Sequence, residues 1–116
     1  MRPPAILALA ALGFFATAAA AAHRTDPAVV QRGHDVFQYW CGACHGAGPG
    51  HPATDALQAK YHDAKPALLE DRRDLTPEQV HFYVRHGISI MPFFRKTEVS
   101  DADLDAIGAY LARMRR

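Results

Sequence analysis

Apolar residues recur at helical spacing in three stretches of the chain, and each stretch opens with residues that favour the start of a helix. The first stretch follows Asp26, a residue type that caps helix N-termini, and Pro27, which suits the first helical position. We expect this helix to run to about Trp40. Its apolar positions are Val29, Val30, Gly33, Val36, Phe37 and Trp40.

The second and third stretches lie in the C-terminal half of the chain. Thr76 and Gln79 are spaced as the two ends of a capping box, and Gly87 is a typical C-terminal stop. The last helix is expected to begin after Ser100, with aspartates in its first turns and arginines at its end, as the helix dipole favours. Its apolar stripe comprises Leu104, Ile107, Gly108, Leu111 and Met114.

The segments between these helices predict loops. A Gly/Pro/His-rich loop is expected at 46–52, a short helical piece at 67–70, and an irregular stretch at 88–99. No run of residues alternates between apolar and polar with a period of two, so we expect no sheet. The predicted fold class is therefore all-α.

The first 22 residues have the composition of a secretory signal peptide. A positive start at Met1 and Arg2 precedes an apolar run, and small residues lead up to Ala22. The apolar core is shorter than the roughly 20 residues of a spanning helix, which favours cleavage over the alternative, an uncleaved membrane anchor. We expect a signal peptide at 1–22 and an exported mature domain at 23–116, with no membrane attachment after cleavage.

Charge and composition exclude several functional classes. The chain has 13 lysines and arginines against 12 aspartates and glutamates, so it offers no basic footprint for nucleic acid. It contains no pattern typical of a catalytic triad, a phosphate-binding loop or a paired-carboxylate site. A mature domain of fewer than about 100 residues has a modest core and often relies on a cofactor or a crosslink.

Cys41, Cys44 and His45 form the pattern C-x-x-C-H, which marks covalent attachment of c-type haem. Two thiols three positions apart can reach the two vinyl groups on one edge of a porphyrin, and the next histidine can then face the iron. Gly42 and Ala43 are small enough to let the backbone lie against the ring edge. The sequence therefore predicts one covalent haem c, attached through Cys41 and Cys44 and ligated by His45.

Three other uses of the two cysteines compete with haem attachment. A redox disulfide usually accompanies a βαβ pattern, which this chain lacks. A structural zinc site usually needs four cysteine or histidine ligands, so two other histidines would have to join the pair. A structural disulfide is the third alternative, since it suits an exported protein. The adjacent histidine, the preceding helix and the export signal favour haem.

Met91 is the expected sixth ligand of the iron. It lies in the irregular stretch, where Pro92 restricts it to an extended conformation and stiffens the loop. The apolar neighbours Ile90, Phe93 and Phe94 are expected to keep water away from the haem.

Other side chains are weaker candidates for the haem site. Met114 lies on the stripe of the last helix and is expected to pack in the core. The second ring nitrogen of His45 is expected to bond a backbone carbonyl in residues 48–52. Rival sixth ligands are His51, His62, His81 and His86. Candidate partners of the haem propionates are Trp40, Lys60, Tyr61 and Arg95.

The pattern as a whole resembles class I cytochrome c over nearly all of residues 23–116. It is carried by Gly33, Phe37, Cys41, Cys44, His45, Met91 and Pro92, and by the aromatic residue of the last helix. The resemblance implies that the first and last helices cross, near Gly33, Phe37, Ile107 and Tyr110. It also implies axial ligation by His45 and Met91.

Three segments, 40–52, 66–70 and 91–98, are similar to the small cytochrome subunits of p-cresol methylhydroxylase-type enzymes. That resemblance implies a large flavoprotein partner with FAD that oxidises a 4-alkylphenol such as p-cresol, eugenol or vanillyl alcohol. This chain would take electrons singly from the flavin, pass them to a periplasmic electron acceptor, and perform no catalysis itself.

Two other functions remain as alternatives at this point. The first is a free-standing soluble electron carrier. The second is a haem enzyme or gas-binding protein with an open sixth site. The apolar residues around Met91 argue against peroxide activation, because that chemistry requires polar groups beside the iron.

Overall fold

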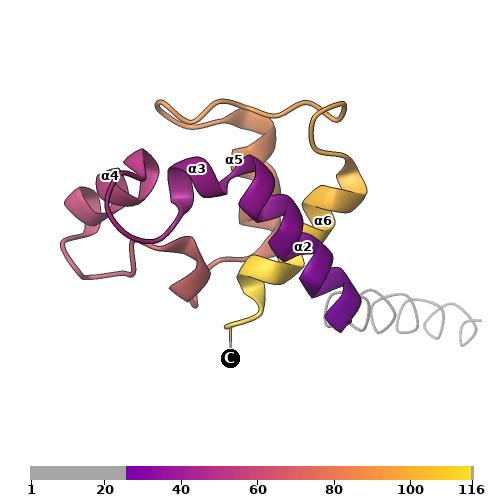
Figure 1. The fold of residues 1–116 in the computed structure, drawn as a ribbon, viewed down its shortest axis with the longest axis horizontal. Coiled ribbons are helices and arrows are strands. Elements are labelled where there is room, and N and C mark those ends of the chain that lie inside the picture. The colour runs from indigo at the N-terminus through magenta and orange to yellow at the C-terminus, as the bar shows by residue number, and fades with distance from the viewer. Residues whose placement is uncertain (1–25, 116) are drawn as a thin grey trace, which may run out of the picture.

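The computed structural model describes residues 26–115, which form an all-helical domain. Its elements are α2 (Pro27–Trp40), α3 (Gly42–His45), α4 (Pro52–Tyr61), the 3-10 helix η1 (Leu69–Asp71), α5 (Pro77–His86) and α6 (Asp101–Ala112). No strand occurs among the described residues, apart from an isolated bridge between Ile88 and Met91. The predicted all-α class is confirmed (Figure 1).

The predicted signal peptide at 1–22 lies outside the described residues. Within residues 26–115, no helix has both the length and the apolar character needed to cross a bilayer.

The three predicted helix starts are confirmed by their caps. The Asp26 carboxylate accepts a 2.8 Å hydrogen bond from the backbone N–H of Ala28 at the start of α2. At α5, the side chain of Thr76 accepts from the N–H of Gln79 at 3.1 Å, and the Gln79 side chain accepts in return at 2.9 Å. The Ser100 hydroxyl accepts from the third residue of α6 at 3.1 Å. Each cap satisfies a backbone donor that the first helical turn leaves free.

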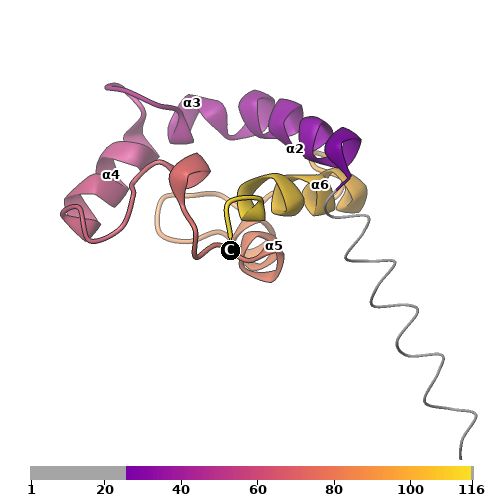
Figure 2. The ribbon, with the colours of Figure 1, turned by 90° about the horizontal axis from the view of Figure 1, so that it is seen from below.

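Helices α2 and α6 are in close contact, as predicted: they cross in Figure 1, and α2 lies above α6 in Figure 2. The approach depends on Gly33, because a Cβ at this position would lie 2.0 Å from the carbonyl oxygen of Ala106. Beyond this contact the rings of Phe37 and Tyr110 meet with their centroids 5.8 Å apart. The Tyr110 hydroxyl donates to the carboxylate of Glu70, which connects α6 to η1.

A single apolar core fills the space between α2, α5 and α6. Phe37, Leu104 and Ile107 are its largest fully buried side chains, together with Val99 from the segment that precedes α6. The buried members of this core are Val36, Phe37, Val80, Val84, Val99, Leu104, Ile107, Tyr110 and Leu111.

The structure differs from the predicted fold in three details. The loop expected at 46–52 is followed directly by a helix, α4, which was not predicted because most of its apolar residues are small alanines; none of its residues is buried. The short helical piece forms at Leu69–Asp71 instead of 67–70. Met114 is 38% exposed, because α6 ends at Ala112 and the apolar stripe does not continue past that point.

We predict that Gly33→Ala destabilises the haem-loaded protein. Alanine would favour the helix by about 1 kcal/mol, but the clash is with the backbone of α6 and no side-chain rotation relieves it. We expect a net loss of about 1–3 kcal/mol in the free energy of unfolding, measured in urea. Tyr39→Ala on the exposed face of α2 is the control and should cost less than about 0.5 kcal/mol. Equal stability of Gly33→Ala and wild type would contradict the packing described here.

Candidate functional site

A cavity of about 290 Å³ lies between the helices, and all five described α-helices contribute to its wall. This volume is near the lower end of the range for ligand pockets, about 300–1,000 Å³. Most of the wall is apolar, from Phe37, Leu57, Leu69, Leu75, Val80, Val84, Ile88, Ile107 and Leu111. Polar groups enter it from Lys60, Tyr61, Lys65, Arg72, Asp74, Gln79 and Tyr83.

Three of the four predicted site residues line this cavity: Cys41, His45 and Met91. His45 follows Cys41 by one helical turn, so both side chains lie on the same side of α3. Cys44 is exposed. Both cysteines are free thiols, and burial raises the pKa of Cys41 to about 11, with a further contribution from Cys44.

His45 combines burial with an unused ring nitrogen. Burial lowers the pKa of its imidazole, which favours the neutral form that binds metal ions. Its Nδ1 atom is buried and has no hydrogen-bond partner among the described residues, so the expected bond to a carbonyl of residues 48–52 is absent there. Buried polar atoms in folded proteins nearly always have a hydrogen-bond partner. The imidazole therefore has bonding capacity that the polypeptide does not use.

Two side chains that the sequence analysis did not identify hold the turn after His45. The Thr54 hydroxyl donates to the carbonyl of Gly46 at 2.9 Å. The Nδ1 of His51 lies 3.2 Å from the carbonyl oxygen of Ala43. The start of α4 therefore buttresses the short helix that carries His45.

None of the four rival histidines lines the cavity. His51 contacts the backbone of α3, and Nε2 of His81 lies 2.8 Å from a carboxylate oxygen of Asp105. His86 stacks on Phe82, with ring centroids 4.4 Å apart. His62 is exposed and ends α4 in a left-handed conformation.

Met91 reaches the cavity from a tight turn. Ile88 and Met91 exchange two backbone hydrogen bonds of 3.1 and 2.9 Å, and Ser89 between them adopts a φ of 54°. Gly87 begins the turn with a φ of 70°, and a Cβ there would lie 2.7 Å from the carbonyl oxygen of Met91. Glycine at 87 is therefore required both for its backbone conformation and for space.

Ile90 and Phe93, which were expected to keep water away from the haem, do not line the cavity. Ile90 is 81% exposed and Phe93 is 60% exposed, because the turn places residue 90 at its tip and directs Ile88 and Met91 to the cavity. Phe94 is the one of the three that packs against the core.

One side of the cavity carries a cationic cluster that no sequence pattern indicated. Arg72 is only 6% exposed, and its Nε and Nη2 donate to the two carboxylate oxygens of Asp74 at 2.6 and 2.7 Å. Lys65 donates to the same carboxylate at 2.9 Å. These bonds, first from Arg72 and then from Lys65, hold the pKa of Asp74 well below its usual range. Of the candidates for propionate contacts, Lys60 and Tyr61 line the cavity, but Trp40 and Arg95 do not.

Residues 28–111 match the sequence model of the family described as cytochrome c oxidase, cbb3-type, subunit III. No curated protein and no solved structure matches the chain. The matched span covers nearly all of α2 through α6 and includes the C-x-x-C-H motif and Met91.

The cofactor that this family match implies is covalent haem c, and the residues present fit it. The cavity has an apolar wall, as a porphyrin face requires, with cations on one side for carboxylates. Next to it stand a pair of free thiols and a neutral imidazole with an unsatisfied nitrogen.

We predict that Asp74→Asn destabilises the protein at neutral pH and that the effect fades in acid. Loss of the carboxylate leaves the buried Arg72 without its counterion, at a cost of about 1–3 kcal/mol in the free energy of unfolding at pH 7. The native pKa of Asp74 is lowered, so its stabilisation is present above the unfolded value of about 3.9 and is lost as the pH falls toward the native pKa.

Urea unfolding at pH 7 and at about pH 2.5 tests this prediction. The difference between wild type and Asp74→Asn should narrow at the lower pH. The control is Asp35→Asn, whose carboxylate bonds Gln31 and His34 on the exposed face of α2 and contacts no buried arginine. Equal losses for the two variants at pH 7, or a difference that does not depend on pH, would contradict the role assigned to Asp74.

Proposed function

Because the chain belongs to the cytochrome c family described as cbb3-type cytochrome c oxidase subunit III, we propose that it carries single electrons on one haem c whose iron is held by His45 and Met91. The observation that carries this proposal is the convergence of the two side chains on one cavity. His45 comes from the helical segment after α2, and Met91 comes from the loop between α5 and α6. The other candidates for the sixth ligand do not line that cavity. These are Met114, His51, His62, His81 and His86.

The polypeptide contributes orientation and environment to this function. Haem iron supplies reversible one-electron oxidation and reduction when bound. His45 offers a neutral imidazole on a helix that α2 and α4 hold in place. Met91 offers a thioether, and ligation by histidine and methionine raises the reduction potential relative to two histidines.

The apolar wall supports the same role. Phe37 and Ile107 are almost fully buried, so the inner side of the cavity excludes water. A low-dielectric surrounding disfavours the extra positive charge of the oxidised state and is a further means of setting the potential. A methionine that closes the sixth position leaves no site for a substrate or a gas, which distinguishes an electron carrier from a haem enzyme. Cytochrome c domains are typically carriers rather than enzymes.

At a finer level, we propose that the protein works in the periplasm after removal of residues 1–22. Its electron donor is then a flavoprotein with FAD that oxidises a 4-alkylphenol, and its acceptor is another periplasmic carrier. The support for this partner is the similarity of segments 40–52, 66–70 and 91–98 to the cytochrome subunits of such enzymes. A free-standing soluble carrier is the second candidate.

The ligand assignment predicts a specific spectroscopic change. Ferric wild type should be low-spin and show the methionine–iron charge-transfer band, and Met91→Ala should lose this band and bind carbon monoxide readily when reduced. Met114→Ala is the matched control, because Met114 lies past the end of α6, outside the cavity wall, and should leave both properties unchanged. Retention of the band in Met91→Ala, or its loss in Met114→Ala, would refute ligation by Met91.

The flavoprotein partner predicts rapid reduction in an anaerobic mixing experiment. Ferric protein mixed with a 4-alkylphenol-oxidising flavoprotein and p-cresol should be reduced with a rate that saturates as the cytochrome concentration rises. Free FAD reduced to the same extent is the control and should show no saturation. A rate no faster than that of free flavin would remove the flavoprotein proposal and leave the carrier role standing.

A further inference from the structure

The loop that carries Met91 is held by different contacts along its length. It spans residues 87–99 between α5 and α6. Next to Met91 its backbone bonds are the two of the turn with Ile88 and the 2.7 Å bond from the Phe94 N–H to the carbonyl of Val84, and further along Arg95 bonds Glu98 and Val99. Pro92, directly after Met91, has no N–H to donate. Ile90 at the tip is exposed and contributes little packing. Met91 and Phe94 pack against the core and Val99 is buried in it, and side-chain contacts from α5 add to this packing.

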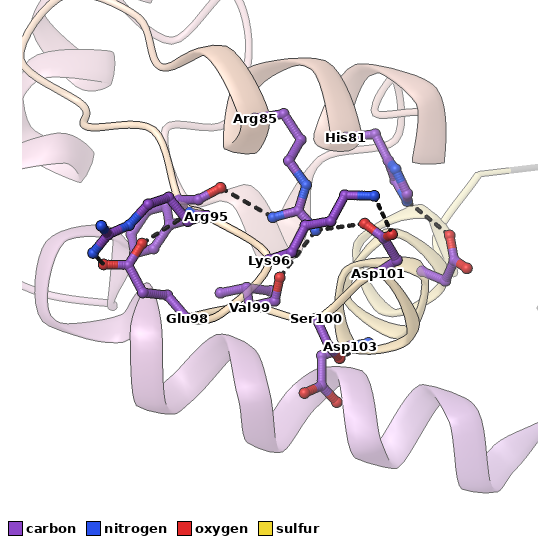
Figure 3. A network of polar contacts seen from close by, with 11 residues as sticks. His81, Arg85, Arg95, Lys96, Glu98, Val99, Ser100, Asp101 and Asp103 are labelled. Carbon is purple, nitrogen blue, oxygen red and sulfur yellow. Dashed lines mark hydrogen bonds and ion pairs between the residues drawn. The ribbon is translucent and has the colours of Figure 1, made fainter.

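Arg85 supplies those contacts from the last turn of α5. Its Nη1 donates to the carbonyl of Phe94 at 3.0 Å, and its Nη2 donates to the carbonyl of Val99 at 2.9 Å. The same Nη2 lies 2.8 Å from the carboxylate of Asp101 in the first turn of α6. Figure 3 shows the guanidinium reaching from its helix to Val99 and Asp101.

The chemistry of the guanidinium suits this position. Its planar fork presents several donors at fixed angles, so one side chain can bond two carbonyls and a carboxylate at once, which an ammonium group does less well. The Arg85 side chain is only 19% exposed, so the bonds are partly shielded from water. Asp101 also pairs with Lys96 at 2.6 Å and keeps one cation if Arg85 is lost. Among the described residues, the carbonyls of Phe94 and Val99 have no second hydrogen-bond donor that would take the place of Arg85.

We propose that Arg85 is a positioning residue for the sixth ligand: it fixes the loop that presents Met91, and it thereby strengthens the methionine–iron bond. The inference rests on the proposed function, because it assumes that Met91 is the ligand. A thioether is a weak ligand, so its bond is easily lost when the loop that carries it moves. Arg85 holds the loop on the C-terminal side of Met91, at Phe94 and Val99, and does not touch the methionine itself.

The test is the affinity of the ferric haem protein for added imidazole, which must displace methionine to bind. In Arg85→Ala the imidazole affinity should rise about 10-fold or more, since a lost bond to a charged group weakens the closed state by enough for that change. The charge-transfer band of the methionine ligand should weaken in parallel. Asp101→Asn keeps the bonds from Arg85 to the two carbonyls and should show a smaller change.

Arg32→Ala is the matched control. Arg32 bonds Asp103 of the same helix at 2.8 Å, the distance that separates Arg85 from Asp101, but it comes from α2 and not from the loop side. The midpoint of thermal unfolding is measured for Arg85→Ala and Arg32→Ala. It shows how far each variant loses general stability, which is then distinguished from a change in imidazole affinity. If Arg85→Ala is not recovered with haem, Arg85→Lys serves, because it keeps the charge and the aliphatic stem but not the fork.

The possible outcomes separate the two proposals. Tighter imidazole binding in Arg85→Ala or Arg85→Lys, with wild-type affinity in Arg32→Ala, supports the positioning role. Unchanged affinity in the Arg85 variants, or equal changes in Arg85→Ala and Arg32→Ala, overturns it and leaves Met91 ligation intact. A wild-type protein without the methionine band overturns Met91 ligation and the positioning role together.

Discussion

The close approach of α2 to α6 at Gly33 is the contact on which the rest of the structure depends. Because Gly33 has no side chain, the backbone of α2 can lie against the carbonyl of Ala106. The same contact brings the ring of Phe37 onto that of Tyr110. The segment that carries Cys41 and His45 follows α2 directly, so the position of α2 sets the position of that segment. The haem-binding motif is therefore placed by the packing of two helices and not by the motif itself.

The two proposed iron ligands are supported in different ways. His45 lies on a short helix that follows α2 almost directly and is buttressed by α4. Met91 lies on a loop whose position depends on a tight turn and on side-chain bonds from α5. Loops open more easily than helices in a core, so the methionine side is the one expected to exchange first. A carrier with one firm and one weak axial ligand needs this kind of tether on the weak side.

Much of the fold followed from local signals in the sequence. The caps at Asp26, Thr76 and Ser100 mark helix starts that depend on neighbouring residues alone, and all three were predicted. Helix α4 was missed, because its apolar face, formed by Ala53, Leu57 and Tyr61, is narrow and only half-buried. Met114 was misplaced, because the spacing of apolar residues does not reveal where the last turn of a helix stops.

The parts of the site that lie within one sequence motif could be predicted. The parts formed by residues that the fold brings together could not. Cys41, Cys44 and His45 form a contiguous motif, and Met91 stands beside a proline in a segment without helical spacing. The pair of Arg72 and Asp74 has no such pattern, and its place on the cavity wall depends on how the segment before α5 folds back. The bonds from Arg85 to two loop carbonyls likewise could not be predicted, because every residue has a backbone carbonyl and the sequence does not indicate which ones accept.

The central claim is that Met91, together with His45, holds the haem iron, and proton NMR of the reduced, haem-loaded protein tests it most directly. A methionine bound to a low-spin ferrous haem lies in the ring current of the porphyrin, so its methyl resonance moves far upfield. Methyl-labelled methionine, with Met91 and Met114 substituted one at a time for assignment, identifies which residue gives the signal. We predict one strongly shifted methyl resonance, from Met91. A spectrum without a shifted methionine methyl, or with one from Met114, would contradict the account.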